Sequence, residues 1–332
     1  MESPRVRRSR RARPSRTRTL LHTILAVVAV VGGTAAGTVY VKARAHSGAG
    51  PVWSSATASA STSGTADGED AVEPVTEPAV DHDALLAAAV KSVPVEDGAE
   101  VSVAALDLDS GASASYGDGA FDTASIVKVD ILAALLLQAQ DAGRHLTADE
   151  KSYATTMIEN SDNTAASELW RTIGRAAGLD AANERLGLTG TEGGDGMLWG
   201  LTQTTTADQL TLLQQVFGDD SKLSEASRTY LQGLMGRIEA DQQWGVSAAA
   251  DGSAWALKNG WLPRSTTGLW DVNSIGRVTV DGSDRLVAVL SKGNSTQAKG
   301  ISLVESVAKA AVSALAGDAS SPAASPSASV PE

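Results

Sequence analysis

Cysteine is absent from the 332 residues, and histidine occurs only four times. Without cysteine, the chain can have no disulfide framework, no cysteine nucleophile and no thiolate metal site. His22 and His46 lie in the N-terminal leader, so a serine-histidine-aspartate triad would have to use His82 or His145. The same scarcity argues against a metal centre built from several histidines. We therefore expect neither a metal nor a cofactor.

Positive charge is concentrated at the N-terminus. The formal net charge is −12, and residues 1–18 contain eight arginines and one glutamate. Together with Lys42 and Arg44 this leader carries +9, which leaves −21 for residues 45–332. An acidic body of this kind does not attract nucleic acid or anionic lipid. Nucleic acid is therefore not an expected partner, and the basic N-terminus needs a separate explanation.

One long apolar run, at residues 20–41, follows the basic tail of residues 1–19. As a helix rising about 1.5 Å per residue, this run could cross a hydrocarbon core of about 30 Å. The arginines would stay in the cytoplasm, which places the body at the outer face of the membrane. We favour a retained single-pass anchor. The alternative is a cleaved signal peptide with Ala43-Arg44-Ala45 as its cleavage site, which would make the protein secreted.

Residues 42–80 and 317–332 are rich in serine, alanine, glycine and proline. This composition cannot bury enough apolar surface to fold, so it predicts a disordered linker and a disordered tail. The folded domain is then expected at 81–316, and we expect it to be a monomer.

Hydrophobic periodicity inside this domain predicts helices separated by strands. Helices are expected at 83–90, 125–139, 148–160, 164–177, 207–217, 224–238 and 301–315. Strands are expected at 100–109, in a short segment ending at Tyr116, and at 254–260, 269–280 and 285–291. This order predicts an α+β fold (an α/β sandwich), in which an antiparallel sheet built from both ends of the domain is flanked by helices and carries an inserted all-α lobe. A functional cleft is expected between sheet and lobe.

The helix predicted at 125–139 carries an S-x-x-K pattern, Ser125-Ile-Val-Lys128. Residues three apart share one face of a helix, so Lys128 can reach the Ser125 hydroxyl. A lysine whose pKa is lowered by burial can take the proton of a serine nucleophile. The pattern alone is weak, and a solvated lysine would be the ordinary explanation. Here, however, the lysine interrupts a helix that is otherwise apolar.

Two further polar motifs follow. Ser161-Asp162-Asn163 stands between two predicted helices, where it could simply cap a helix, or could relay a proton through Ser161 and offer the Asn163 amide. Lys258-Asn259-Gly260 stands on a predicted strand, where it could be a solvated edge, or could hold a substrate carboxylate beside a glycine that lets substrate approach.

S-x-x-K, S-D-N and K-x-G in this order resemble the signature of class A β-lactamases and penicillin-binding proteins. The resemblance runs from about Asp81 to Leu315 and includes the segments VSVAALDLDSG, NSDNTAASELW and TTTADQL. It implies the β-lactamase/transpeptidase-like fold and a serine hydrolase.

The resemblance also implies roles for the motif residues. Ser125 would attack the carbonyl of a β-lactam or of a D-Ala-D-Ala-type peptide from the peptidoglycan stem and form an acyl-enzyme. Lys128 would be the base and Ser161 the proton relay. Substrate would be bound by Asn163, Lys258, Asn259, Gly260 and Trp261, with the backbone N–H groups of Ser125 and Trp261 forming the oxyanion hole.

Three departures from the family pattern qualify this interpretation. Asn259 replaces the usual threonine or serine, and Trp261 follows directly. The interval from Ser125 to Ser161 is short, which predicts a more open cleft. The E-x-x-L-N motif, whose glutamate activates the deacylating water, is missing, and Glu192 and Asp195 are weak replacements flanked by glycines.

Acylation machinery is thus predicted, whereas fast deacylation machinery is not. Three functions stay open: a β-lactamase-like hydrolase that is slow in deacylation, a DD-peptidase, and a non-hydrolytic protein that binds penicillin or a cell-wall fragment.

Overall fold

The computed structural model describes residues 80–252 and 254–317. Its larger sheet is antiparallel, with strand order β2-β1-β7-β6-β5. The strands are β1 (Glu100–Asp107), β2 (Ser113–Tyr116), β5 (Trp255–Pro263), β6 (Trp270–Val280) and β7 (Ser283–Asn294). Strands from both ends of the domain therefore share one sheet, as the sequence predicts, and β5 forms one of its edges.

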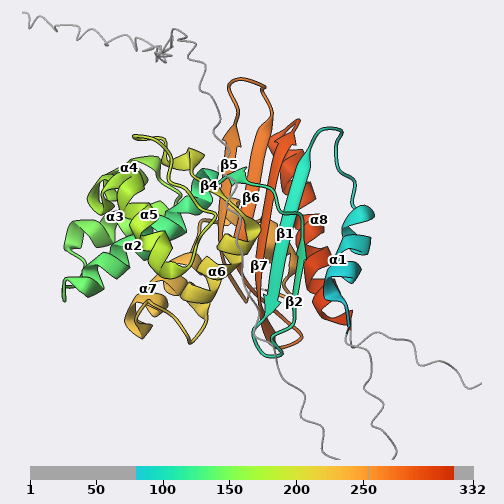
Figure 1. Ribbon diagram of the computed structural model, residues 1–332, viewed down its shortest axis with the longest axis horizontal. Coiled ribbons are helices and arrows are strands. Elements are labelled where there is room, and N and C mark those ends of the chain that lie inside the picture. Colours follow the sequence, from blue (N-terminus) through green and yellow to red (C-terminus); the bar gives the residue numbers. More distant parts are fainter. Residues whose placement is uncertain (1–79, 253, 318–332) are drawn as a thin grey trace, which may run out of the picture. The chain divides into compact units, whose positions relative to one another are not determined.

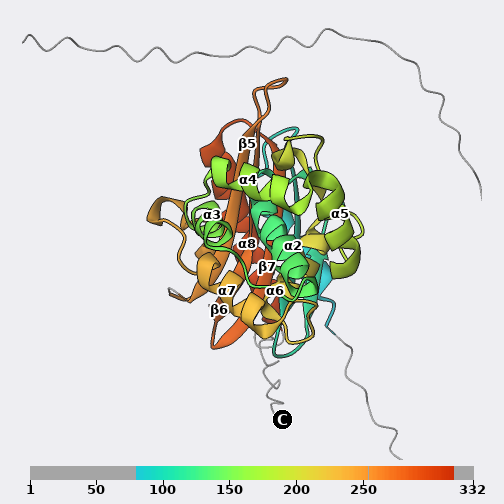
Figure 2. The same ribbon diagram turned by 90° about the vertical axis from the view of Figure 1, so that its left-hand side faces the viewer.

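Helices cover both faces of this sheet (Figure 1). On one face lie α1 (His82–Lys91) and α8 (Gln297–Leu315), which pack against each other and against the strands. The helical lobe lies on the other face and is turned toward the viewer in Figure 2. In the sequence it is inserted between β3 (Phe121–Asp122) and β5. It contains α2 (Val127–Asp141), α3 (Ala148–Glu159), α4 (Asn163–Ile173), α5 (Arg175–Leu186), α6 (Thr206–Phe217) and α7 (Glu225–Met235). The predicted α+β fold with an inserted all-α lobe is confirmed.

The strand β7 shows how the sequence supplies both faces of the sheet. Leu286, Ala288 and Leu290 belong to the core under the helical lobe, whereas Val287 and Val289 belong to the core under α1 and α8. Successive side chains of a strand point to opposite faces, so a strand that is covered on both sides is apolar at every position. This is why residues 286–290 form a continuous apolar run.

One predicted helix is wrong in extent. The segment 164–177 is two helices, because α4 ends at Ile173 and α5 begins at Arg175. Gly174 adopts φ 98° and Arg175 φ 59°, both in the left-handed region that ends a helix. Periodicity missed α5 because only two of its residues, Leu179 and Leu186, are large and apolar. The two-strand sheet of β3 (Phe121–Asp122) and β4 (Gln203–Thr204) was likewise too short to predict.

No helix within residues 80–252 and 254–317 is long and apolar enough to span a membrane. The predicted anchor at 20–41, most of the linker at 42–80 and nearly all of the tail at 317–332 lie outside the described residues.

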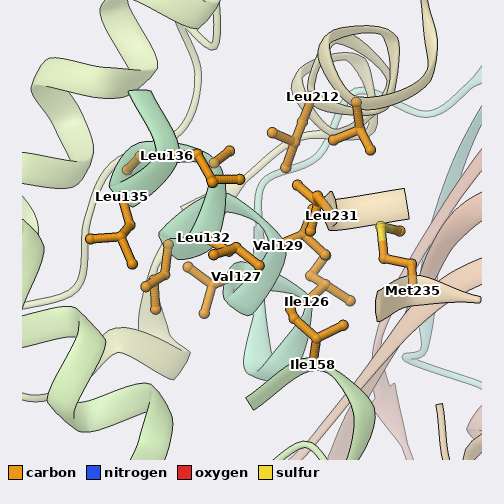
Figure 3. Packing of buried hydrophobic residues seen from close by; sticks show 14 of the residues in the cluster. Ile126, Val127, Val129, Leu132, Leu135, Leu136, Ile158, Leu212, Leu231 and Met235 are labelled. Atoms are coloured by element: carbon orange, nitrogen blue, oxygen red, sulfur yellow. The ribbon is translucent and has the colours of Figure 1, made fainter. Parts of the chain in front are cut away.

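The helix α2 forms the centre of the lobe (Figure 3). Twelve of its 15 residues are buried. Figure 3 shows Leu132 and Leu136 surrounded by side chains of neighbouring helices, among them Leu212 and Leu231. Burial of this much apolar surface, at about 25 cal/mol per Å², fixes the helix firmly. A polar group among the buried residues of α2 is therefore held in a dry and rigid environment.

Asp130 is one such polar group, two residues after Lys128. It is 1% exposed, and neither carboxylate oxygen has a hydrogen-bond partner among the described residues. Burial raises the pKa of Asp130 to about 8, and the nearby carboxylates of Asp180 and Asp208 add to the rise. Since the folded-state pKa lies above the unfolded value, the folded protein loses stability as pH rises from about 4 through about 8.

We expect Asp130→Asn to stabilise the protein in a pH-dependent way, because it removes a buried charge that forms only at higher pH. The melting temperature should rise by about 3 °C or more at pH 8.5 and by less at pH 5. Thermal denaturation across this range measures the effect. Asp141→Asn, at the exposed end of the same helix, loses its ion pair with Arg185 and should gain no stability. An equal gain for Asp130→Asn at both pH values would contradict the assignment.

Candidate active site

Ser125 lies in the 3₁₀ turn η1 (Ala124–Ile126), which leads directly into α2. It is partly exposed, whereas both of its neighbours in the turn are buried. Ala124 adopts φ 48°, a left-handed conformation that costs a non-glycine residue about 1–2 kcal/mol. The surrounding structure must hold this turn in place, and such strain is common next to reactive groups.

Two contacts hold the turn. On β5, Gly260 lies so close that a Cβ atom there would be 2.7 Å from Ser125 N and 2.8 Å from Thr123 O. On β6, the buried Asn273 donates from Nδ2 to Asp122 O at 2.9 Å and to Thr123 O at 3.1 Å. The edge of the sheet therefore directly supports residues 122–126, which carry the predicted nucleophile Ser125 and are called the nucleophile turn below.

Lys128 is completely buried one turn further along. Its Nζ donates to Ser161 O at 2.6 Å, to Ser161 Oγ at 3.0 Å and to Asn163 Oδ1 at 2.8 Å. Burial lowers the pKa of Lys128 to about 7, against the opposing effect of Asp162. A lysine with this pKa is substantially neutral near physiological pH, so it can accept a proton.

Lys258 approaches the same hydroxyl from β5. It is also completely buried, and its Nζ donates to Ser161 Oγ at 3.1 Å and to Asn259 O at 2.9 Å. Burial, with the nearby charge of Lys128, holds the pKa of Lys258 well below its usual range. One residue of each motif, Lys128, Ser161 and Lys258, is thus brought together at the Ser161 hydroxyl. The backbone of Ser161 has φ 56°.

The remaining predicted residues take different positions. Asn163 is exposed, and its Oδ1 is bound to Lys128. Asn259 is buried, and its Nδ2 donates to Gln242 O at 2.7 Å and Trp244 O at 3.0 Å, so both of its N–H groups are used within the protein. Trp261 is half-buried, with its ring centroid 5.9 Å from that of Trp244.

The loop between α5 and α6, residues 187–205, packs on the nucleophile turn through η2 (Trp199–Leu201). Lys128 Nζ lies over the Trp199 ring, 5.0 Å from its centroid. The indole Nε1 donates to Ser167 Oγ at 3.2 Å, which fixes the ring. Glu192 and Asp195 of the same loop are both exposed. The loop therefore presents an aromatic ring to Lys128, and neither of these two carboxylates accepts a hydrogen bond from the lysine.

Sequence reasoning missed Trp199 and Asn273. A signal for Asn273 existed, since an asparagine in the apolar strand 269–280 must find buried partners. Trp199 had no such signal, because its position depends on how a glycine-rich loop folds. Among residues 80–252 and 254–317, no group of three histidine, aspartate or glutamate side chains is arranged to hold a metal ion.

Comparison with known proteins assigns the chain to a family. A sequence model described as the β-lactamase enzyme family matches residues 143–315, slightly more than half of the chain. The chain belongs to this family. The matched range includes Ser161 and Lys258, whereas Ser125 and Lys128 precede it. No curated protein sequence is a significant match.

Solved structures share the fold of this β-lactamase family member. A mutant of PBP-A, in an acyl-enzyme complex with penicillin G, is 24% identical with a TM-score of 0.60, over 70% of this chain and 97% of PBP-A. The TLA-1 extended-spectrum β-lactamase is 16% identical with a TM-score of 0.61, over 70% and 98% of the two chains. A β-lactamase from Xanthomonas campestris is 20% identical with a TM-score of 0.57, over 70% and 97%. Fold and family are those of a hydrolase of β-lactamase type.

The close approach at Gly260 yields a prediction. Gly260→Ala should lower the free energy of unfolding by about 1–3 kcal/mol, because the added methyl meets backbone atoms of the nucleophile turn that cannot move freely. Urea denaturation measures the loss.

Gly236→Ala is the matched control. Its Cβ would meet Gln232 O at an ordinary 3.5 Å, at a φ of −81° that alanine adopts freely. Stability should be unchanged or slightly higher, because the unfolded chain loses freedom. Equal effects of the two substitutions would mean that Gly260 does not support the turn.

Proposed function

We propose that the protein is a serine acyl-transfer enzyme that forms an acyl-enzyme at Ser125 with β-lactams or D-Ala-D-Ala-type peptides and hydrolyses it slowly. The observation that carries the proposal is the convergence of two buried lysines on Ser161 Oγ, one turn from a partly exposed serine. Burial of two cationic groups is costly, and groups buried at such a cost cluster at functional sites.

In the proposed reaction, Ser125 Oγ attacks the carbonyl carbon and its proton passes to neutral Lys128. The proton then moves through Ser161 Oγ to the leaving nitrogen as the amide C–N bond breaks, which leaves an ester at Ser125. The relay is supported by the 3.0 Å contact between Lys128 Nζ and Ser161 Oγ. The backbone N–H groups of Ser125 and Trp261 bind the oxyanion, because β5 and the nucleophile turn lie side by side at Gly260.

Substrate binding is assigned to β5 and to the start of α4. Lys258, when protonated, anchors the substrate carboxylate, and the exposed Asn163 amide binds the substrate side chain. Gly260 lets the substrate lie against the strand, and Trp261 limits the far end of the site. Asn259 contributes through its backbone, since its side-chain donors are already used.

Slow deacylation follows from the loop at 187–205. A β-lactamase of class A uses a glutamate to activate the hydrolytic water, and this loop places Trp199 over Lys128 instead. An aromatic ring cannot accept a proton from water. The acyl-enzyme complex of PBP-A with penicillin G is consistent with a stable ester in a protein of this fold.

The same geometry serves a DD-peptidase, in which the leaving group is a terminal D-alanine. Lys258 favours this alternative as much as the first, because both substrate classes carry a carboxylate. A purely non-hydrolytic binding protein is disfavoured by the intact arrangement of Lys128 and Ser161.

We place the domain, as a monomer, at the outer face of the cytoplasmic membrane, tethered through residues 20–41 and the linker at 42–80.

Incubation with benzylpenicillin tests the proposal. Intact-protein mass spectrometry should show an adduct of one penicillin that persists for minutes or longer, with little bulk hydrolysis. Ser125→Ala should form no adduct. Rapid turnover without a lasting adduct would contradict slow deacylation, and absence of both adduct and turnover would contradict acylation by β-lactams. Release of D-alanine from a D-Ala-D-Ala peptide, measured separately, tests the peptidase.

The pKa of Lys128 predicts a pH dependence. Because neutral lysine is the base, the acylation rate should rise about tenfold per pH unit below pH 7 and level off above it. Stopped-flow acylation between pH 5 and pH 9 measures this profile. Lys128→Arg should abolish the rise, because arginine stays protonated throughout this range. A wild-type profile that still rises steeply at pH 9 would show that another group is the base.

A further inference from the structure

Asn259 differs from the residue usual at its position, and its side chain has a definite task in the structure. Lys258 and Asn259 are neighbours on β5, so their side chains leave the strand on opposite sides. Lys258 reaches Ser161 directly. Asn259 reaches the segment before β5, where its Nδ2 donates to Gln242 O at 2.7 Å and Trp244 O at 3.0 Å.

This segment is in turn bound to the turn that carries Ser161. The buried side chain of Gln242 donates from Nε2 to Asn160 O at 3.1 Å, next to Ser161. Glu239 N donates to Glu159 O at 3.0 Å, and Asn160 Nδ2 donates to the Glu239 carboxylate. The side chains of Lys258 and Asn259 therefore meet the same turn, one directly and the other through Gln242.

The turn needs such support. Ser161 adopts φ 56°, which serine leaves readily unless its neighbours hold it. Its carbonyl lies 2.6 Å and its hydroxyl 3.0 Å from Lys128 Nζ. A shift of the turn would break both contacts and admit water to Lys128, whose charged neighbours are Asp162 and Lys258.

We propose that Asn259 is a positioning residue for Ser161, acting through Gln242 on the turn at Asn160, and that it does not bind substrate with its side chain. The inference rests on the proposed function, since it concerns the geometry of proton transfer from Ser125. It also accounts for the departure in the third motif. The Asn259 amide donates to two carbonyls, at 2.7 Å and 3.0 Å, whereas threonine and serine have a single O–H donor and cannot make both bonds.

Isosteric substitutions provide the test. Asn259→Asp and Gln242→Glu keep size and shape but replace each N–H donor with an oxygen that faces a carbonyl. Each should slow acylation by benzylpenicillin roughly 10- to 100-fold, as expected for a small displacement of catalytic groups. The midpoint of the pH profile should move upward, because hydration of Lys128 and the new negative charge near it both return its pKa toward the ordinary value. Asn259→Thr should also slow acylation, although it restores the hydroxyl usual in the family.

Gln232→Glu is the matched control. Gln232 on α7 donates from Nε2 to Val216 O at 2.7 Å, the same kind of bond without contact to the motif residues. This variant should lose stability but keep the wild-type pH midpoint. The double variant of Asn259→Asp and Gln242→Glu should be little slower than either single variant, because both break one chain of contacts.

The outcomes separate the two proposals. If wild-type protein shows neither a penicillin adduct nor penicillin turnover, the proposed acylation by β-lactams fails, whatever the variants do. Two results would show that the positioning role is wrong when the wild type is acylated. One is an Asn259→Asp variant with the wild-type pH midpoint, and the other is a double variant whose slowing is the product of the slowing by Asn259→Asp and by Gln242→Glu. If Asn259→Thr accelerates acylation, the side chain at this position binds substrate.

Discussion

Two buried lysines share one serine hydroxyl, and the rest of the domain can be understood from the cost of that arrangement. Lys128 Nζ and Lys258 Nζ lie 3.0 Å and 3.1 Å from Ser161 Oγ, and both side chains have no exposed surface. Two ammonium groups that both contact one hydroxyl repel each other strongly in a dry environment. Burial lowers the pKa of both lysines, and the nearby charge of Lys128 lowers the pKa of Lys258 further, so that the site readily holds a neutral amine.

The architecture brings the two lysines together from opposite sides. Lys128 is fixed by the apolar surroundings of α2, which crosses the middle of the helical lobe. Lys258 is fixed by β5, at the edge of a sheet that is covered on both faces. Because each lysine belongs to a different layer, a change in the packing of lobe against sheet would alter their separation. The site is therefore most sensitive at the contacts between layers, such as the one at Gly260.

Sequence reasoning reached the fold and the three residues that meet at the site, Lys128, Ser161 and Lys258, because these depend on local patterns. The interrupted apolar helix indicated Lys128, and the alternation and turn signals indicated the sheet strands on both sides of the lobe. It could not place Asn259, since a side chain's partners depend on which segment packs beside the strand. It also missed Trp199, because the glycine-rich loop has no periodicity from which a position could be inferred. Both are cases in which contacts distant in sequence decide the environment.

Two residues of the site, Ala124 and Ser161, have left-handed backbone conformations. Ala124 and Ser161 both pay a conformational cost, and each is held by asparagine or glutamine side chains that donate to backbone carbonyls: Asn273 holds the turn of Ala124, and Gln242 holds the turn of Ser161. Such bonds fix carbonyl positions without adding charge, so they leave the pKa of the lysines to be set by burial. In the proposed reaction two tasks are thus separate: neutral amides position the backbone, while buried amines transfer the proton. This separation explains why the third motif can carry an asparagine without loss of the lysine arrangement beside it.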